Sequence, residues 1–108
     1  MSMQVPKKMR AARIHEIGGA PIVDEVGVPD IDDEEVLVCV RACGIVPNLL
    51  NVLRRWPTVF PDLPLPPSPA IFGLDPAGEV AQVGARVKGV KIGDRVYVNP
   101  IRACNTCR

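Results

Sequence analysis

The strongest pattern of hydrophobic and polar positions lies at residues 35–44, EVLVCVRACG, which are mostly branched or apolar and end at Gly44. β-Branched residues favour the pleated, half-buried surface of a sheet, so this segment predicts a strand. Weaker patterns, each closed by turn residues, predict four more strands at 9–17, 21–31, 78–84 and 95–98. An acidic turn at 30–35 separates the second strand from the third.

The apolar period changes to a helical one in residues 47–56. Five apolar residues there can gather on one helical face, and Pro47 suits the first turn; they are Leu49, Leu50, Val52, Leu53 and Trp56. Residues 57–70 are so rich in proline that we expect them to form an extended, polyproline-like loop.

These elements predict a mainly β fold with one or two short helices, arranged as a partly open barrel. The chain has twelve prolines, eight of them between Pro47 and Pro76, which argues against a helix bundle because proline cannot donate a backbone hydrogen bond. A length of 108 residues fits one domain. We expect residues 1–8 to be a flexible tail and 9–108 to form the domain.

Composition and charge exclude several classes of function. Thirteen basic and twelve acidic residues leave a net charge of +1, which gives no electrostatic footprint for nucleic acid. The apolar runs are too short to cross a membrane, and no signal peptide is visible, so we expect a cytoplasmic protein. In that reducing compartment the four cysteines are expected to be thiols or metal ligands rather than disulfides.

Two residues stand out as candidates for chemistry. Cys43 ends the strongest strand just before the helix, where it is either a metal ligand or reactive nucleophile, or else a small buried hydrophobic residue. Asp75 lies in the otherwise apolar segment IFGLDPAG, where a desolvated carboxylate needs backbone donors or a cation. Cys39, in mid-strand, is expected in the core. The single histidine, His15, is expected to be an ordinary strand residue.

Cys104 and Cys107 have metal-ligand spacing, C-N-T-C. A structural zinc needs four ligands, so this pair is half of a zinc site or else a redox dithiol. Cys39 and Cys43 supply the other two ligands only if one of them turns away from the core.

Five segments in order resemble the N-terminal half of the medium-chain dehydrogenase/reductase superfamily, which includes zinc-type alcohol dehydrogenases and quinone oxidoreductases. They are MRAARIHEIGG, EVLVCVRACGI, GLDPAGEVAQVG, VKIGDRVYVNP and ACNTC. The resemblance implies a GroES-like substrate domain that precedes a Rossmann domain, acting on a small molecule with NAD or NADP. An apolar face that a cofactor domain would cover also predicts homo-oligomers.

The resemblance implies a match at individual positions. Cys43 corresponds to a cysteine that binds the catalytic zinc in the family, and Asn48 stands where the family has a proton-relaying hydroxyl. Leu74 replaces the zinc-binding histidine of the zinc enzymes, and Asp75 replaces their glutamate. The motif GLDPAG looks more like the zinc-free quinone oxidoreductase branch. A catalytic zinc needs three protein ligands, so this pattern argues against one at Cys43. The resemblance implies that Cys43, Asn48 and Asp75 lie near the reacting centre.

The resemblance also places Cys104 and Cys107 on the first two positions of a structural-zinc lobe, which would be incomplete in this chain. No G-x-G-x-x-G fingerprint for a dinucleotide occurs, so the chain by itself is expected to be inactive. Two alternatives to an oxidoreductase domain are a stand-alone GroES-like module for binding or oligomerisation, and a metal-binding protein that uses all four cysteines.

Overall fold

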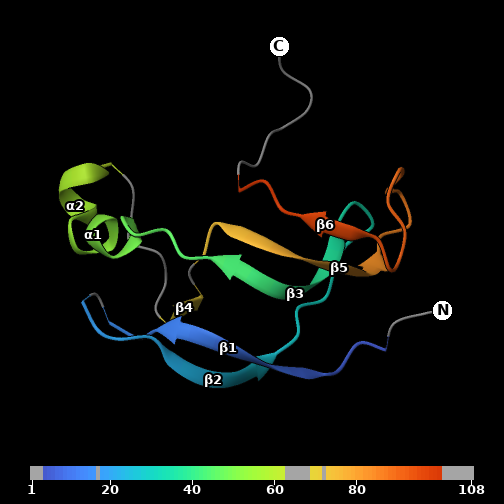
Figure 1. Cartoon of the computed structure of the whole chain (residues 1–108), viewed down its shortest axis with the longest axis horizontal. Helices are drawn as coiled ribbons and strands as arrows, with labels where there is room; N and C mark the ends of the chain where they lie inside the picture. Colours follow the sequence, from blue (N-terminus) through green and yellow to red (C-terminus); the bar gives the residue numbers. More distant parts are fainter. Residues whose placement is uncertain (1–3, 17, 63–68, 72, 101–108) are drawn as a thin grey trace, which may run out of the picture. The chain divides into compact units, whose positions relative to one another are not determined.

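The computed structural model describes residues 4–16, 18–62, 69–71 and 73–100. Its elements are antiparallel strands in two three-stranded sheets, together with two short helices (Figure 1). The chain divides into two compact units. One, called here the β5 unit, comprises residues 1–5, 30–45 and 73–108; the other, the β1 unit, comprises residues 6–29 and 46–72.

The sheet of the β5 unit contains β3 (Val36–Gly44), β5 (Asp75–Val83) and β6 (Arg95–Tyr97), with β5 in the middle. Figure 1 shows β5 between its two partners. Val80 on β5 is fully buried and its neighbour Ala81 is nearly so. The Val80 N–H donates to the Asp94 carbonyl at 2.9 Å, and the Val80 carbonyl accepts from Gly93 N–H at 2.9 Å. The central strand is therefore tied to the turn that starts β6.

Two turns of the β5 unit are fixed by hydrogen bonds. In the exposed acidic turn, the Asp32 carboxylate accepts from Glu34 N–H at 2.8 Å, and the Glu35 carbonyl accepts from Gly84 N–H at 2.8 Å. In the Gly-Asp turn, the Asp94 carboxylate accepts from Lys91 N–H at 3.0 Å. That hydrogen bond is the main cause that lowers the pKa of Asp94. The turn that starts β6 is thus closed through the Lys91 backbone.

The sheet of the β1 unit contains β1 (Lys8–Ile14), β2 (Ile22–Gly27) and β4 (Ala70–Ile71), with β1 in the middle. Ala11 and Ile14 on β1 are buried. The expected tail boundary at residue 8 is corrected here, because Lys8 pairs with Gly27 and the Lys7 carbonyl accepts from Val28 N–H at 3.0 Å. Pairing with β2 therefore begins before the apolar pattern does.

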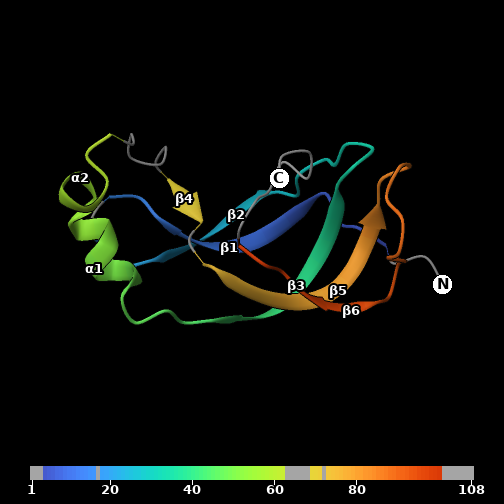
Figure 2. The same cartoon turned by 90° about the horizontal axis from the view of Figure 1, so that it is seen from above.

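The helices of the β1 unit are α1 (Leu49–Arg54) and α2 (Trp56–Val59), which follow one another directly (Figure 2). Leu53 is buried, and the Trp56 and Phe60 rings lie 4.8 Å apart between centroids. The expectation that residues 57–70 are wholly extended is wrong at its start, since Pro57 lies in the first turn of α2. Proline is tolerated there because the N–H of a first-turn residue has no helical partner.

The predicted fold class is confirmed: the protein is mainly β with two short helices, and its sheets are not closed. Each predicted strand has a counterpart. Two features differ from the pattern: β5 begins at Asp75 rather than residue 78, and β4 lies in the segment expected to be a loop. Among the described residues, no helix is long and apolar enough to span a membrane.

One carboxylate in the β1 unit binds two basic side chains. The Asp24 carboxylate on β2 accepts from Arg13 Nε at 2.8 Å, and its Oδ2 lies 2.6 Å from His15 Nε2. These hydrogen bonds, chiefly that of Arg13, hold the pKa of Asp24 below its ordinary value. The expectation that His15 is an ordinary strand residue is wrong, because β1 ends at Ile14 and His15 instead joins the Asp24 cluster just beyond the strand.

This cluster predicts an acid-sensitive contribution to stability. Because the folded-state pKa of Asp24 lies below the unfolded value, the contribution is present at neutral pH and is lost as the pH falls through and below the ordinary aspartate range. We expect Asp24→Asn to lower the melting temperature slightly at pH 7 and to have a smaller effect as the pH falls toward 3. Thermal unfolding followed by circular dichroism across this range measures it. Asp62→Asn, at an exposed carboxylate, is the control; an Asp24→Asn effect that grows with falling pH would contradict the assignment.

Candidate active site

Two predicted site residues come together at the end of the β3–β5 ladder. Cys43 is paired with Pro76, and Gly44 is paired with Asp75. Cys43 and Asp75 therefore lie on adjacent strands one register position apart, at the point where β3 ends and β5 begins, and their side chains start from opposite faces of the ladder because side chains alternate along a strand. This pairing depends on the early start of β5, which the sequence pattern did not predict.

Cys43 is exposed, so its interpretation as a small buried hydrophobic residue is wrong. Its Sγ lies 3.7 Å from the carbonyl oxygen of Gly44. Cys39, four residues earlier on the same strand, is half-buried, which agrees in part with its expected core position. The thiol at the end of β3 is the accessible one of these two.

Asp75 is also exposed, which removes the need for compensating donors that a desolvated carboxylate would have. It is the first residue of β5 and faces Gly44 across the ladder. A side chain at residue 44 would begin 3.4 Å from Asp75 Cβ and 3.7 Å from Asp75 Oδ2. Glycine at residue 44 therefore leaves the space beside the carboxylate open.

The absence of a side chain at Gly73 leaves space for the Cys43 thiol. A Cβ built on Gly73 would lie only 2.8 Å from Cys43 Sγ, closer than real Cβ contacts come. Two glycines, Gly44 and Gly73, thus leave space around the Cys43–Asp75 pair. The pattern GLDPAG contained this signal, because glycine commonly marks a close approach of backbone to another group.

The close approach at Gly73 predicts a change in thiol reactivity. We expect Gly73→Ala to force Cys43 Sγ into another rotamer and to slow its alkylation by maleimide several-fold, because the added methyl group crowds the sulfur. The measurement uses a Cys39→Ser, Cys104→Ser, Cys107→Ser background, in which Cys43 is the only thiol. Gly27→Ala is the control, since a Cβ at Gly27 meets nothing within 4 Å. Equal alkylation rates in the two variants would contradict the predicted contact.

Asn48 belongs to the β1 unit, at the N-cap position of α1. Its side chain makes no capping hydrogen bond, while its carbonyl accepts from Val52 N–H at 2.9 Å. The absence of a cap leaves the carboxamide available for another partner. Its place relative to Cys43 and Asp75 stays a prediction.

The donor set around Cys43 does not fit a catalytic zinc. Such a site needs three protein ligands and an open position. Cys43 and Asp75 offer one thiolate and one carboxylate, and the intervening motif residue, Leu74, has no donor. No group of three His, Cys, Asp or Glu side chains able to hold a metal occurs in the part of the chain that the structure describes. Cys104 and Cys107, expected in a structural-zinc lobe, lie outside the described residues.

Comparison with known proteins identifies the family. Residues 32–108 match the alcohol dehydrogenase GroES-like domain. The chain therefore belongs to that family, and its predicted resemblance to the N-terminal part of the medium-chain dehydrogenase/reductase superfamily is confirmed.

Individual relatives come from both branches of the superfamily. The chain is 36% identical to a sorbitol dehydrogenase of Bacillus subtilis (strain 168), over 99% of this chain and 29% of the relative. It is 38% identical to a quinone oxidoreductase of Lama guanicoe, over 82% of this chain and 26% of the relative. The chain thus spans less than a third of the length of these curated relatives.

A solved structure shows the same fold. The cobalt- and zinc-bound thermostable alcohol dehydrogenase of Pyrobaculum aerophilum matches with a TM-score of 0.76 and 32% identity, covering 94% of this chain and 29% of that one. The backbone arrangement described above is therefore shared with an alcohol dehydrogenase.

Proposed function

We propose that this chain is the substrate domain of an NAD(P)-dependent oxidoreductase that acts on a small carbonyl compound, alcohol or activated alkene. The observation that carries the proposal is the position of Cys43 and Asp75 one register step apart at an open strand end, in a chain of the alcohol dehydrogenase GroES-like family. Polar groups at strand ends meet ligands readily, because the backbone there is no longer fully paired within the sheet. The similar proteins named above are enzymes, which favours this function over a stand-alone binding module.

The cofactor would be held by another part of the enzyme, because no dinucleotide fingerprint occurs in these 108 residues. When bound, the nicotinamide supplies or accepts the hydride, and a proton from solvent balances the reduction of a carbonyl or alkene. The residues of this domain would orient the substrate. The Asn48 amide and the Cys43 thiol are donors that can polarise a substrate oxygen, as hydrogen-bond donors do where no metal is available. The Asp75 carboxylate would accept a hydrogen bond from a substrate hydroxyl.

The proposed centre works without catalytic zinc. Support comes from the two-donor set at Cys43 and Asp75 and from the resemblance of GLDPAG to the zinc-free quinone oxidoreductase branch. A structural zinc at Cys104 and Cys107, completed by further cysteines, is a separate proposal. We also propose a cytoplasmic, homo-oligomeric protein, in keeping with the composition and with the apolar face that a cofactor domain would cover.

The test is steady-state reduction of a quinone and an alkenal with NADH or NADPH, and oxidation of alcohols with NAD⁺ or NADP⁺, by the full-length protein. We expect Asp75→Asn and Cys43→Ser each to reduce kcat/KM about 10-fold or more, since removing one polarising group from a centre costs this much or more. Cys39→Ser, on the same strand, is the matched control and should keep its activity.

Zinc dependence is tested separately with 1,10-phenanthroline. We expect activity to survive treatment that removes loosely held zinc. Loss of activity that is restored by zinc alone, with Cys43→Ser abolishing the restoration, would refute the zinc-free centre. No activity on any of the three substrate classes would refute the oxidoreductase itself.

A further inference from the structure

A shallow depression lies on the sheet of the β5 unit, and its lining begins at the Ala42–Ala77 pair, one rung before Cys43. Its volume is about 230 Å³, several times the roughly 30 Å³ that one water molecule occupies in the liquid. The residues that matter for the inference include three charged side chains and three small ones: Arg41, Glu79, Arg95, Ala42, Ala77 and Gly78. All belong to β3, β5 and β6.

Two arginines lie on the strands on either side of the central strand. Arg95 on β6 is paired with Glu79 on β5, and Arg41 on β3 reaches Glu79 from the other side. Neighbouring strands lie about 4.8 Å apart, so the arginine backbones are separated by about two such spacings. Each guanidinium group lies at the end of a long, flexible side chain, so the two groups can approach each other above β5.

One carboxylate stands between two cations, so the depression keeps an excess of positive charge. The single Arg41–Glu79 contact is 3.5 Å long, and the Arg41 side chain is 64% exposed, so this ion pair is weak. Among the described residues, Arg95 forms no ion pair at all. A guanidinium presents five N–H donors in a planar fork that matches carboxylate and phosphoryl oxygens.

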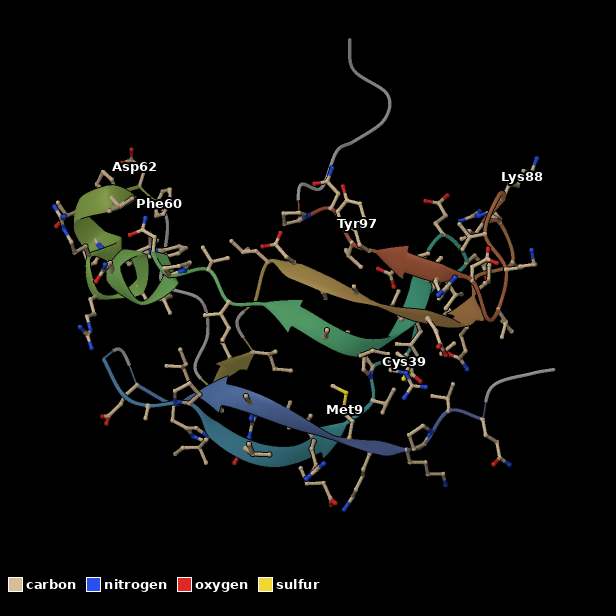
Figure 3. The ribbon with its side chains drawn as sticks, viewed as in Figure 1. Met9, Cys39, Phe60, Asp62, Lys88 and Tyr97 are labelled. Carbon is tan, nitrogen blue, oxygen red and sulfur yellow. The ribbon has the colours of Figure 1, made fainter. Side chains whose placement is uncertain are left out.

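The floor of the depression is made of small residues. Ala42, Ala77 and Gly78 leave the backbone of the sheet uncovered by large side chains. Tyr97 lies on β6 opposite Ala77 and is 75% exposed (Figure 3). Side chains two residues apart along a strand point to the same face, so Tyr97 is on the same face of β6 as Arg95. A ligand bound by the arginines would therefore find an apolar floor and an aromatic ring beside it.

We propose that this depression binds a small-molecule oxyanion, a phosphoryl or carboxylate group, between Arg41 and Arg95. Glu79 competes with the anion for Arg41 and therefore lowers the affinity of the site for the anion. The site does not include Cys43 or Asp75, and it does not depend on the proposed oxidoreductase activity.

The experiment is an NMR titration of the full chain with inorganic phosphate, followed through the arginine Nε–H signals. We expect saturable shifts at Arg41 and Arg95 that weaken with added sodium chloride, because salt screens exposed charges. Arg95→Met should weaken binding about 10-fold, since a hydrogen bond to a charged group contributes about this factor. Arg41→Met should weaken it less. Arg10→Met, at an exposed arginine on β1, is the matched control and should leave binding unchanged.

Glu79→Gln makes the test independent of damage to the fold. This variant removes the competing charge while keeping the size of the side chain, so phosphate should bind several-fold more tightly. A parallel titration with acetate identifies the group: tighter phosphate binding assigns a phosphoryl ligand, and tighter acetate binding assigns a carboxylate. The proposal is overturned if shifts do not saturate, if Arg10→Met weakens binding as much as Arg95→Met, or if Glu79→Gln fails to tighten it.

Discussion

Replacing Gly78 with alanine is expected to destabilise the β5 unit strongly. A Cβ at residue 78 would overlap the carbonyl oxygen of Cys39, and it would lie 2.8 Å from that carbonyl carbon and 3.0 Å from Val40 Cα. All three atoms belong to the backbone of the neighbouring strand, so no side chain can rotate to relieve the contact. β3 and β5 would have to separate where they pair.

The cost should be at the upper end of overpacking effects, about 3 kcal/mol, because the obstructing atoms are backbone. For a domain near this size, such a loss lowers the melting temperature by on the order of 10 °C. Thermal unfolding by circular dichroism measures it, and recovery in the insoluble fraction would report a still larger loss. Gly27→Ala is the control, because it makes the same change on a strand with nothing within 4 Å. Equal melting temperatures for the two variants would contradict the predicted overlap.

Replacing Gly84 with alanine is expected to displace the acidic turn. Gly84 is buried, and a Cβ there would overlap the Asp32 carbonyl oxygen and lie 2.5 Å from the carbonyl carbon and oxygen of Asp33. The Asp33 carbonyl also accepts from Arg86 N–H at 2.8 Å. Moving the turn away from residue 84 would therefore break a hydrogen bond as well as a packing contact.

We expect Gly84→Ala to cost about 2 kcal/mol, a typical value for an overpacked contact. Gly89→Ala isolates a different effect: its φ is +83° and nothing lies within 4 Å of an added Cβ, so only backbone strain of about 1 kcal/mol applies. Urea unfolding of both variants gives the two free energies. A smaller loss for Gly84→Ala than for Gly89→Ala would show that the acidic turn yields easily.

The candidate site could be predicted only in part. The resemblance named Cys43 and Asp75, and the structure brings them together across the β3–β5 ladder. Their exposure was not predictable from residue type, because free cysteine is usually buried and Asp75 lies in an apolar segment. The contact between Gly73 and the thiol depends on the register of two strands, which no local pattern specifies.

The start of β5 shows why a local rule failed. The predicted strand began at residue 78, and Pro76, which lacks an N–H, would ordinarily argue against a central strand before that point. In the sheet, only the donor is lost: the Pro76 carbonyl still accepts from Val98 N–H at 2.9 Å. β4 was missed for a related reason, since a two-residue strand has no periodicity and exists only through its pairing with β1.

The sequence by itself determined the strand-rich class, the helical segment and the family, because apolar periodicity and turn residues act locally and the motifs keep their order along the chain. Only the tertiary structure decided which strands pair, in which register, and which side chains remain exposed. These properties depend on contacts between residues distant in sequence, such as Gly44 with Asp75 and Glu79 with Arg95. Both the Cys43–Asp75 pair and the Arg41–Arg95 depression are products of that pairing.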